Sequence, residues 1–301
     1  MNRLSIEERA QIIAALVEGN SIRATCRMTG AAKGTVLRLL DNVGQACAEY
    51  QDNVLQDLNS KRVECDEIWS FCHAKQKNVP DGMKGVYRYG DVYTWVALDS
   101  DTKLAITWLV GLRDYPCARA FIQDLADRLT NRVQLTTDGH AVYVNAVENA
   151  FGADIDYAML VKMYGPALEP KGRYSPAQCT GTQVIHLMGN PDPDAISTSY
   201  VERQNLTMRM SMRRFTRLTN AFSKKVENLE AAVALHFMYY SFCCVHKTLG
   251  TTPVMAAGIT KKRGTVRDIA LMLEPLPTFA VYCAPAGDVL SWSSQLKPPI
   301  E

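Results

Sequence analysis

Apolar residues recur at helical spacing through the N-terminal segment of the chain. In SIEERAQIIAALVEG they fall every three or four positions, which predicts an amphipathic helix. Ser5 is its expected N-cap, and Glu8 completes a capping-box pattern three residues later. The pattern predicts two further short helices, over 21–28 and 31–40, joined by a tight turn at Thr29-Gly30.

Three short helices with such a turn fit a helix-turn-helix template. Val36 and Leu39 are expected to pack the third helix inward. Lys33, Thr35 and Arg38 would then face the major groove of DNA and its phosphates. A plain three-helix bundle without a DNA-binding role has the same pattern, so DNA binding here is a hypothesis.

A polar stretch over 49–61 predicts a helical linker, and beyond it the pattern changes to strand-like runs. Apolar runs bounded by turn residues predict five strands, over 62–71, 92–99, 103–111, 133–137 and 156–163. Helical spacing returns over 115–129, over 141–150, and from 199 to about 247 with a break near Thr219-Asn220. The stretch 165–198 is polar with turn signals and predicts irregular structure.

The order β-β-β-α-β-α-β-α predicts an α/β fold with a mixed five-stranded sheet between helices. In such a sheet the first and fourth strands can lie side by side. Asp66 belongs to the first strand and Asp138 follows the fourth, 138 − 66 = 72 positions later. A helix packed over the sheet can then supply Glu202, so three acids are expected to converge. This is the ribonuclease H-like arrangement.

Converging carboxylates suit hard divalent cations such as Mg²⁺ or Mn²⁺. Two such ions clamp the attacking and leaving oxygens of a phosphoryl transfer. Asp66 is expected to bridge both ions, while Asp138 and Glu202 each hold one. Glu67 should point to the opposite face of its strand, which argues against it as a ligand.

Each acid also has an ordinary explanation as a cap, a turn residue or a first-turn helix acid. Their joint occurrence in the expected elements favours the catalytic interpretation. His140 lies beside Asp138 and is a candidate accessory residue that would touch the scissile phosphate. A surface turn histidine is the alternative.

An amide and several arginines follow Glu202 along the same predicted helix. The residues concerned are Asn205, Arg209, Arg213, Arg214 and Arg217. At about 100° per residue, the first three lie within about 60° of Glu202 around the helix axis. Because arginine pairs with phosphate in a bidentate fork, this stripe predicts DNA binding. A solvated basic face is the alternative.

The composition is that of an ordinary globular chain, with 301 residues, 47% hydrophobic and 21% charged. A formal net charge of +2 excludes a generic polyanion binder, so nucleic-acid affinity must come from local clusters. No run approaches the roughly 18 apolar residues of a membrane span, and no secretory signal is recognised. The nine cysteines contain no CxxC pair, so we expect no disulfide framework or zinc ribbon, and a reducing cytoplasm.

Four segments together resemble bacterial insertion-sequence transposases of the IS-one type. They are CDEIWSF, TTDGH, STSYVERQNLTMRMSMRRFTRLTNAFSKK and MYYSFCCVHKTLGTTPVMAA, and the resemblance covers roughly residues 60–260. These acidic-triad (DDE) enzymes are distantly similar to retroviral integrases. The resemblance implies a ribonuclease H-like fold and cut-and-join chemistry on DNA. It also implies two divalent metal ions, held by Asp66, Asp138 and Glu202.

We therefore expect a DNA transposase that cleaves and joins strands at insertion-sequence ends. The expected domains are a helix-turn-helix over 1–48, a linker over 49–61, a catalytic domain over 62–250 and a tail over 251–301. Its partners would be element-end and target DNA in a bacterial, nucleoid-associated setting. We also expect a dimer or larger assembly, because two ends must be joined. Two alternatives remain: a catalytically silent DNA-binding regulator, and a ribonuclease H-like nuclease without joining activity.

Overall fold

The computed structural model describes residues 4–86, 88–165, 178–216 and 219–274. The chain divides into two compact units. Unit 1 comprises residues 1–54 and 230–301, and unit 2 comprises residues 55–229. Unit 2 contains the sheet and all three predicted acids. No helix in the described ranges combines the length and apolar character needed to cross a membrane.

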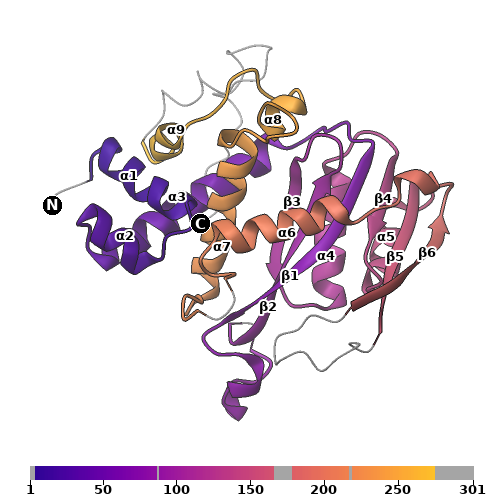
Figure 1. Cartoon of the computed structure of the whole chain (residues 1–301), viewed down its shortest axis with the longest axis horizontal. Helices are drawn as coiled ribbons and strands as arrows, with labels where there is room; N and C mark the ends of the chain where they lie inside the picture. Colours follow the sequence, from indigo (N-terminus) through magenta and orange to yellow (C-terminus); the bar gives the residue numbers. More distant parts are fainter. Residues whose placement is uncertain (1–3, 87, 166–177, 217–218, 275–301) are drawn as a thin grey trace, which may run out of the picture. The chain divides into compact units, whose positions relative to one another are not determined.

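Unit 2 is built on a mixed sheet that has six strands in the described part of the chain (Figure 1). The strands are β1 (Arg62–Cys72), β2 (Gly90–Asp99), β3 (Ala105–Gly111), β4 (Val133–Thr137), β5 (Ile155–Gly165) and β6 (Gln178–Met188). Their order is β3-β2-β1-β4-β5-β6. β1 pairs with β4, and β4 with β5, in parallel, whereas the other neighbours are antiparallel. This mixed sheet is compatible with a ribonuclease H-like fold.

The five predicted strands are all present, but the prediction of a five-stranded sheet is wrong. β6 lies inside the stretch 165–198, which the sequence predicted as irregular. Residues 182–186 of this strand are exposed in succession, so neither face of it is covered. It therefore lacks the alternation of apolar and polar residues that marks a half-buried strand. Backbone pairing with β5 defines it instead.

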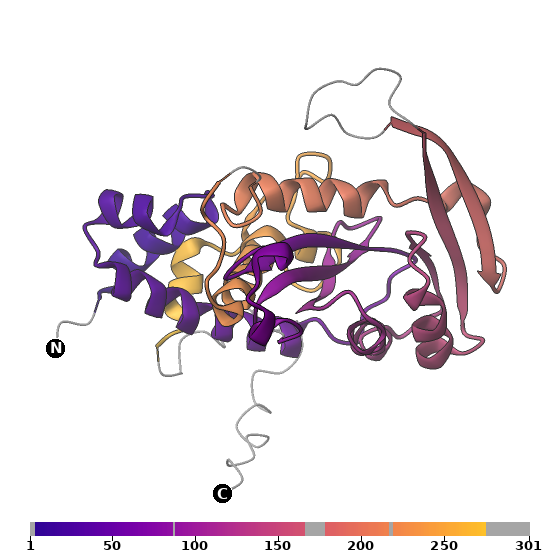
Figure 2. The same ribbon diagram turned by 90° about the horizontal axis from the view of Figure 1, so that it is seen from below.

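Helices cover both faces of the sheet (Figure 2). α4 (Tyr115–Asp127) and α5 (Val142–Phe151) lie on one face, and α6 (Ser199–Ser211) lies across the other. α4 begins where Asp114 accepts a hydrogen bond from the backbone N–H of Cys117 (3.1 Å), a standard N-cap. Three 3₁₀ turns, Gln76–Asn78, Asp81–Met83 and Pro193–Ala195, complete the unit.

Aromatic side chains fill the core between the sheet and its α4–α5 layer. Trp95 of β2 is fully buried, with Phe121 of α4 at 5.8 Å and Tyr143 of α5 at 5.4 Å between ring centroids. Tilted and edge-to-face pairs of this kind contribute about 0.5–1.5 kcal/mol each beyond their buried area. This core fixes the α4–α5 layer beneath the ends of β1 and β4.

Unit 1 is helical in its described residues. It contains α1 (Ile6–Val17), α2 (Ile22–Thr29), α3 (Lys33–Val54), most of α7 (Val226–Met238), a π-helical turn (Tyr239–Cys243), α8 (Pro253–Ala256) and α9 (Val266–Leu271). The capping box of Ser5 and Glu8 is confirmed. Gly30 ends α2 with φ 72°, in the left-handed region that glycine tolerates.

α3 is longer than the predicted helix over 31–40 and includes the first residues of the predicted linker. Its close packing explains this length. A Cβ on Gly44 would lie 2.4 Å from the Ala231 Cα, so glycine lets α3 approach α7 within unit 1. Gln51 donates to the carbonyl of Ala234 at 3.0 Å and secures the last turns. Tertiary contacts of this kind extend a helix beyond its local apolar pattern.

The C-terminal residues also take part in unit 1. Residues 230–250, predicted within the catalytic domain, group with this unit. The predicted tail over 251–301 contains α8 and α9 in its described portion. Arg9 of α1 forms a 2.7 Å ion pair with Glu274, which links the two ends of the unit.

Candidate active site

The register between β1 and β4 brings the first two predicted acids together. Cys65 is paired with Thr137 in the parallel ladder, and this pair is its last step. Asp66 and Asp138 are the next residues on their respective strands. They therefore emerge side by side at the carboxyl end of β4, where the chain leaves the sheet. The prediction that the first and fourth strands are neighbours is confirmed.

A third acid joins them, and it is Glu67. Carboxylate oxygens of Asp66, Glu67 and Asp138 lie within 4.8 Å of one another. The argument from strand alternation against Glu67 was therefore wrong. β4 ends beside Cys65, so the edge of β1 next to Glu67 is open. A glutamate side chain is long enough to reach round this edge from the opposite face.

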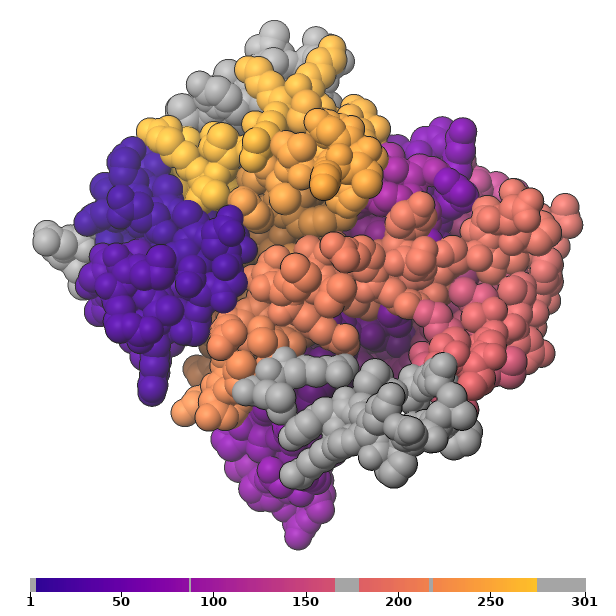
Figure 3. Space-filling view, viewed as in Figure 1, coloured from indigo at the N-terminus to yellow at the C-terminus, as the bar shows by residue number. Residues whose placement is uncertain are grey.

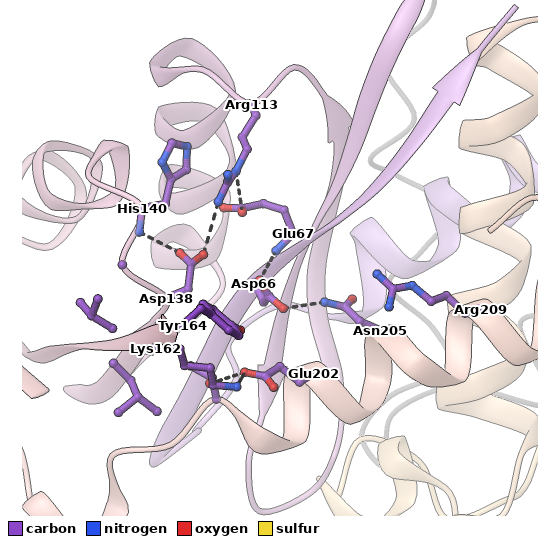
Figure 4. A pocket seen from close by; sticks show the side chains of 14 residues that line it. Asp66, Glu67, Arg113, Asp138, His140, Lys162, Tyr164, Glu202, Asn205 and Arg209 are labelled. Carbon is purple, nitrogen blue, oxygen red and sulfur yellow. Dashed lines mark hydrogen bonds and ion pairs between the residues drawn. The ribbon is translucent and has the colours of Figure 1, made fainter. Parts of the chain in front are cut away.

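Asp138 is held by donors on both of its oxygens. Its Oδ1 accepts from the backbone N–H of His140 at 3.0 Å, and its Oδ2 accepts from Arg113 at 3.3 Å. Arg113 also donates to Glu67 Oε2 at 3.2 Å. The Glu67 side chain is 1% exposed. One guanidinium thus bridges a buried and a half-buried acid (Figure 4).

α6 is anchored on β1 by side chains two residues apart on the same face. Buried Glu64 accepts hydrogen bonds from the backbone N–H groups of Tyr200 and Val201, at 2.8 and 2.9 Å. A carboxylate at this position complements the positive end of the helix dipole. Asp66 accepts from the Asn205 amide at 2.8 Å, one turn further along. These contacts set where the helix crosses the strand.

Glu202 stands on the first turn of α6 and faces the acids across the pocket (Figure 4). Its carboxylate is hydrogen-bonded to Lys162 of β5 and accepts from the Thr198 hydroxyl at 2.6 Å. It is not part of the three-acid group. Its charge nevertheless contributes to a raised pKa of Asp66, so the two acids interact.

A pocket of about 540 Å³ connects these side chains. It is lined by the four acids Asp66, Glu67, Asp138 and Glu202, and by Arg113, His140, Lys162, Tyr164, Asn205 and Arg209, among others. The space-filling view shows a hollow between α6 and the β5–β6 hairpin (Figure 3). The predicted residues Asp66, Asp138, Glu202, Asn205 and Arg209, with His140, all line this one pocket.

The crowded acids hold protons more tightly than usual. Burial, the charge of Asp138 and the charge of Glu202 raise the pKa of Asp66 to about 6. Burial and Asp138 raise the pKa of Glu67 to about 7, against the opposing effect of Tyr143 and Arg113. A positive ion among these carboxylates would favour their charged forms.

His140 is packed against the aromatic core at the edge of the pocket. Its ring stacks on Trp95 with 6.3 Å between centroids. Burial and the nearby Arg113 lower its pKa, although Asp138 acts in the opposite direction. Its side chain is placed against Trp95 while its backbone N–H orients Asp138.

The donor set fits a hard divalent cation. Asp66, Glu67 and Asp138 offer oxygens close together, as Mg²⁺ or Mn²⁺ requires. The amide oxygen of Asn205 adds a second observation. It is buried, lines the pocket and accepts no hydrogen bond from any described residue. Buried polar atoms without partners are rare, and a cation is one way to satisfy this one.

The predicted basic stripe is interrupted. α6 ends at Ser211 and Met212 is extended, so exposed Arg213 does not continue the line of Asn205 and Arg209. Met212 and Phe215 bury their side chains, which turns the chain away from the helix axis. These facts correct the placement predicted for Arg213.

Arg214 points into unit 2 and donates from Nε to the Ser223 hydroxyl at 2.7 Å. Burial lowers its pKa to about 10. This hydrogen bond gives Arg214 a structural contact within unit 2, and its role in DNA binding stays a prediction. Arg217 lies outside the described residues. In unit 1, Lys33 and Arg38 are exposed and Thr35 is half-buried near the start of α3.

Sequence reasoning missed Glu64, Arg113 and Lys162, which shape the pocket, and it argued against Glu67. Two signals were available. Glu64 and Asp66 are acids at a two-residue spacing within the first predicted strand, which places both on one face. Lys162 is the only charged residue in the apolar run YAMLVKMYG. No comparable signal marks Arg113, which comes from a loop after β3.

The chain has a structural likeness to a solved protein. No protein-family model and no curated protein matches the chain. Among solved structures it is similar to a piggyBac transposase synaptic complex with hairpin DNA, determined by cryo-electron microscopy. The identity is 12% and the TM-score is 0.36, over 89% of this chain and 70% of that chain.

Proposed function

We propose that the chain is a DDE-type DNA transposase that cleaves and joins DNA strands at insertion-sequence ends. The observation that carries the proposal is the pocket in which Asp66, Glu67 and Asp138 face Glu202. Buried acids are costly unless they serve a bound cation or an ion pair. Here four acids line a pocket with only three cationic side chains, Arg113, Lys162 and Arg209.

Two divalent ions, Mg²⁺ or Mn²⁺, would supply charge neutralisation of a phosphodiester and activation of the attacking water or 3′-hydroxyl. Asp66 lies between the Asp138 side and the Glu202 side of the pocket, which suits the predicted bridging role. Glu67 is a fourth acid on the Asp138 side. Arg113 keeps the carboxylates of Glu67 and Asp138 in fixed orientations through its two hydrogen bonds.

The remaining pocket residues suit contact with a polyanion. Arg209 lines the pocket on α6 one turn beyond Asn205. Its guanidinium is suited to a phosphate oxygen next to the reacting group. No covalent protein–DNA intermediate is required, because in-line displacement at phosphorus needs only a positioned oxygen and charge stabilisation.

DNA-end recognition is assigned to α1–α3 in this proposal. Lys33, Thr35 and Arg38 lie near the start of α3, which follows the Gly30 turn as a recognition helix would. A dimer or larger assembly in a bacterial cytoplasm belongs to the same proposal, since two ends must be processed together.

Strand cleavage tests the catalytic assignment. Wild-type protein and Asp138→Asn should be incubated with labelled element-end DNA and Mn²⁺, with Asp81→Asn, an exposed loop acid, as the matched control. We expect Asp138→Asn to lose at least about 1,000-fold in nicking while retaining DNA binding. Unchanged nicking would remove Asp138 from the site.

Two other outcomes distinguish the alternatives. DNA binding without cleavage by the wild type at any divalent metal concentration would favour a silent regulator. Cleavage without joined products would favour a nuclease. Joined products that form with the wild type and not with Asp138→Asn would support the transposase.

The role of α3 has a separate test. Arg38→Gln should weaken binding to all DNA duplexes and reduce the slope of log K against log salt by about 1, as expected for one lost phosphate contact. Lys84→Gln, a loop lysine paired with Asp81, is the control. An unchanged salt slope would argue for a helical bundle without a DNA-binding role.

A further inference from the structure

Each acid of the pocket has a hydrogen-bond donor among the described residues. Arg113 serves Glu67 and Asp138 together, and the Asn205 amide serves Asp66. Glu202 differs because its charged partner, Lys162, contacts no other acid of the pocket among the hydrogen bonds and ion pairs described. Lys162 is thus hydrogen-bonded to the acid that stands apart from the three-acid group, although the charge of Asp66 also acts on it.

Lys162 is charged and reachable by solvent. Burial alone would lower its pKa, but the hydrogen bond and charge of Glu202 raise the pKa above its usual value. The side chains of Lys162 and Glu202 are 28% and 40% exposed. An ion pair of this exposure is weak, and a lysine stem reorients easily.

We propose that Lys162 is a displaceable counter-ion, which holds Glu202 when metal is absent and binds a DNA phosphate when a divalent ion takes the Glu202 carboxylate. Metal and DNA then bind cooperatively at this pocket. This inference rests on the proposed function, because it takes Glu202 to be a metal ligand.

Direct competition is the first reason. Lys162 and the Thr198 hydroxyl both contact Oε1 of Glu202. A divalent ion on this carboxylate would lie next to the Lys162 ammonium. Two cations close together repel strongly in a partly buried pocket. The ammonium therefore has to move away when the ion binds.

The charge of the pocket is the second reason. Its lining carries four acids and three cationic side chains, a formal charge of 3 − 4 = −1. A DNA phosphate is repelled by such a lining. One divalent ion changes the formal charge to +1 and displaces the Lys162 ammonium from its hydrogen-bonded acid, Glu202. A DNA phosphate would then replace Glu202 as the partner of the Lys162 ammonium. Because such coupling is reciprocal, a bound phosphate would also favour the metal-bound form of the pocket.

Metal binding in solution tests the exchange without relying on activity. Binding of Mn²⁺ is measured by electron paramagnetic resonance of the free ion, with and without a DNA duplex. Without DNA, Lys162→Gln should bind Mn²⁺ about fivefold more tightly than wild type, the upper end for a partly exposed ion pair. Lys162→Arg should resemble wild type, and Lys84→Gln, which breaks the Asp81 ion pair elsewhere in unit 2, is the control.

The DNA duplex provides the second measurement. Wild-type protein should bind Mn²⁺ more tightly when DNA is present, and Lys162→Gln should lose most of that gain. Equal or weaker Mn²⁺ binding by Lys162→Gln without DNA would overturn the inference, because Lys162 would then support the site. An undiminished gain with DNA would overturn it as well.

Glu202→Gln separates this inference from the proposed function. If Glu202→Gln binds Mn²⁺ as wild type does, Glu202 is no ligand and the two-metal assignment fails with it. If Glu202→Gln weakens Mn²⁺ binding but Lys162→Gln changes nothing, the proposed function stands and only the counter-ion role is lost. Thermal melting of each variant confirms that it is folded.

Discussion

The two sides of the candidate active site are held in place by different kinds of interaction. On the sheet side, Asp66 and Asp138 follow directly from the last paired step of the β1–β4 ladder. On the helix side, Glu202 depends on side-chain contacts: Glu64 at the α6 N-terminus and Lys162 at the carboxylate. One side is set by backbone hydrogen bonds and the other by groups that can exchange partners.

The backbone ladder of the sheet side therefore fixes the positions of its acids without neutralising their charges, whereas the helix side neutralises the charge of Glu202. A backbone ladder keeps Asp66 and Asp138 adjacent whatever their protonation state, although their mutual repulsion is unfavourable without a cation. The helix side neutralises its own acid and loses little when metal is absent. We therefore expect the sheet side to be the more sensitive to pH and the helix side to be the more adjustable.

The largest effect is expected from removing a single acid, on either side of the pocket. Asp66→Asn and Glu202→Gln should each lower the rate of strand cleavage by at least about 1,000-fold, because both acids are proposed to act on one reacting phosphate. The measurement is single-turnover nicking of element-end DNA with Mn²⁺. If one variant keeps cleavage within tenfold of wild type, the corresponding side of the pocket takes no part in the reaction.

The next effect is a pH dependence that belongs to the sheet side. The pKa of Asp66 is raised from 3.8 to about 6, so folding takes up a proton near pH 5. The stability that this group contributes is complete below pH 4 and is lost as the pH rises through 6. A shift of two units corresponds to roughly 3 kcal/mol, which partial exposure reduces to about 2 kcal/mol. Glu67, with a pKa of about 7, extends the loss toward pH 8.

Urea unfolding with a chelator at pH 5 and pH 8 measures this dependence. Wild-type protein should be less stable at pH 8, and Mg²⁺ should restore much of the loss. Asp66→Asn should flatten the curve, whereas Glu202→Gln should reduce its slope by less, because Glu202 is a smaller cause of the raised pKa of Asp66 than burial or Asp138. An equal slope in wild type and Asp66→Asn would show that the sheet side does not carry the effect.

The smallest effect concerns the anchor of α6. Glu64→Gln keeps one oxygen for the N–H groups of Tyr200 and Val201 but removes the negative charge at the helix N-terminus. We expect a loss of about 1 kcal/mol in unfolding free energy, together with weaker Mn²⁺ binding. Glu49→Gln, on the exposed face of α3, is the control. A shift no larger than that of the control would mean that Glu64 does not position α6.

The sequence predicted the sheet well where burial imposes a pattern. β4 was predicted with the bounds observed, and β1, β2 and β5 within about two residues, since apolar runs between turn residues mark buried strands. β6 was missed because its side chains are exposed on both faces, and only pairing with β5 makes it a strand. Where an element owes its existence to a distant partner, local periodicity carries no signal.

The candidate site divides in the same way. Asp66 and Asp138 were correctly brought together from strand order alone, since neighbouring parallel strands end at the same edge. The sequence argued against Glu67 as a ligand because Cβ atoms alternate between the two faces of a strand. This alternation does not fix where the carboxylate of a long side chain lies. Arg213 was placed by extending helical spacing beyond Ser211, where the burial of Met212 and Phe215 ends the helix.

By itself the sequence determined the buried strands and which two acids leave adjacent strands, because both follow from short-range periodicity and connection order. It did not determine the exposed strand β6 or the full length of α3. Only the tertiary structure decided the partners of those acids. Lys162 meets Glu202 across 40 positions, and Arg113 meets Glu67 across 46. Such contacts depend on strand register and on where α6 crosses β1, which are set by the packing of the whole unit.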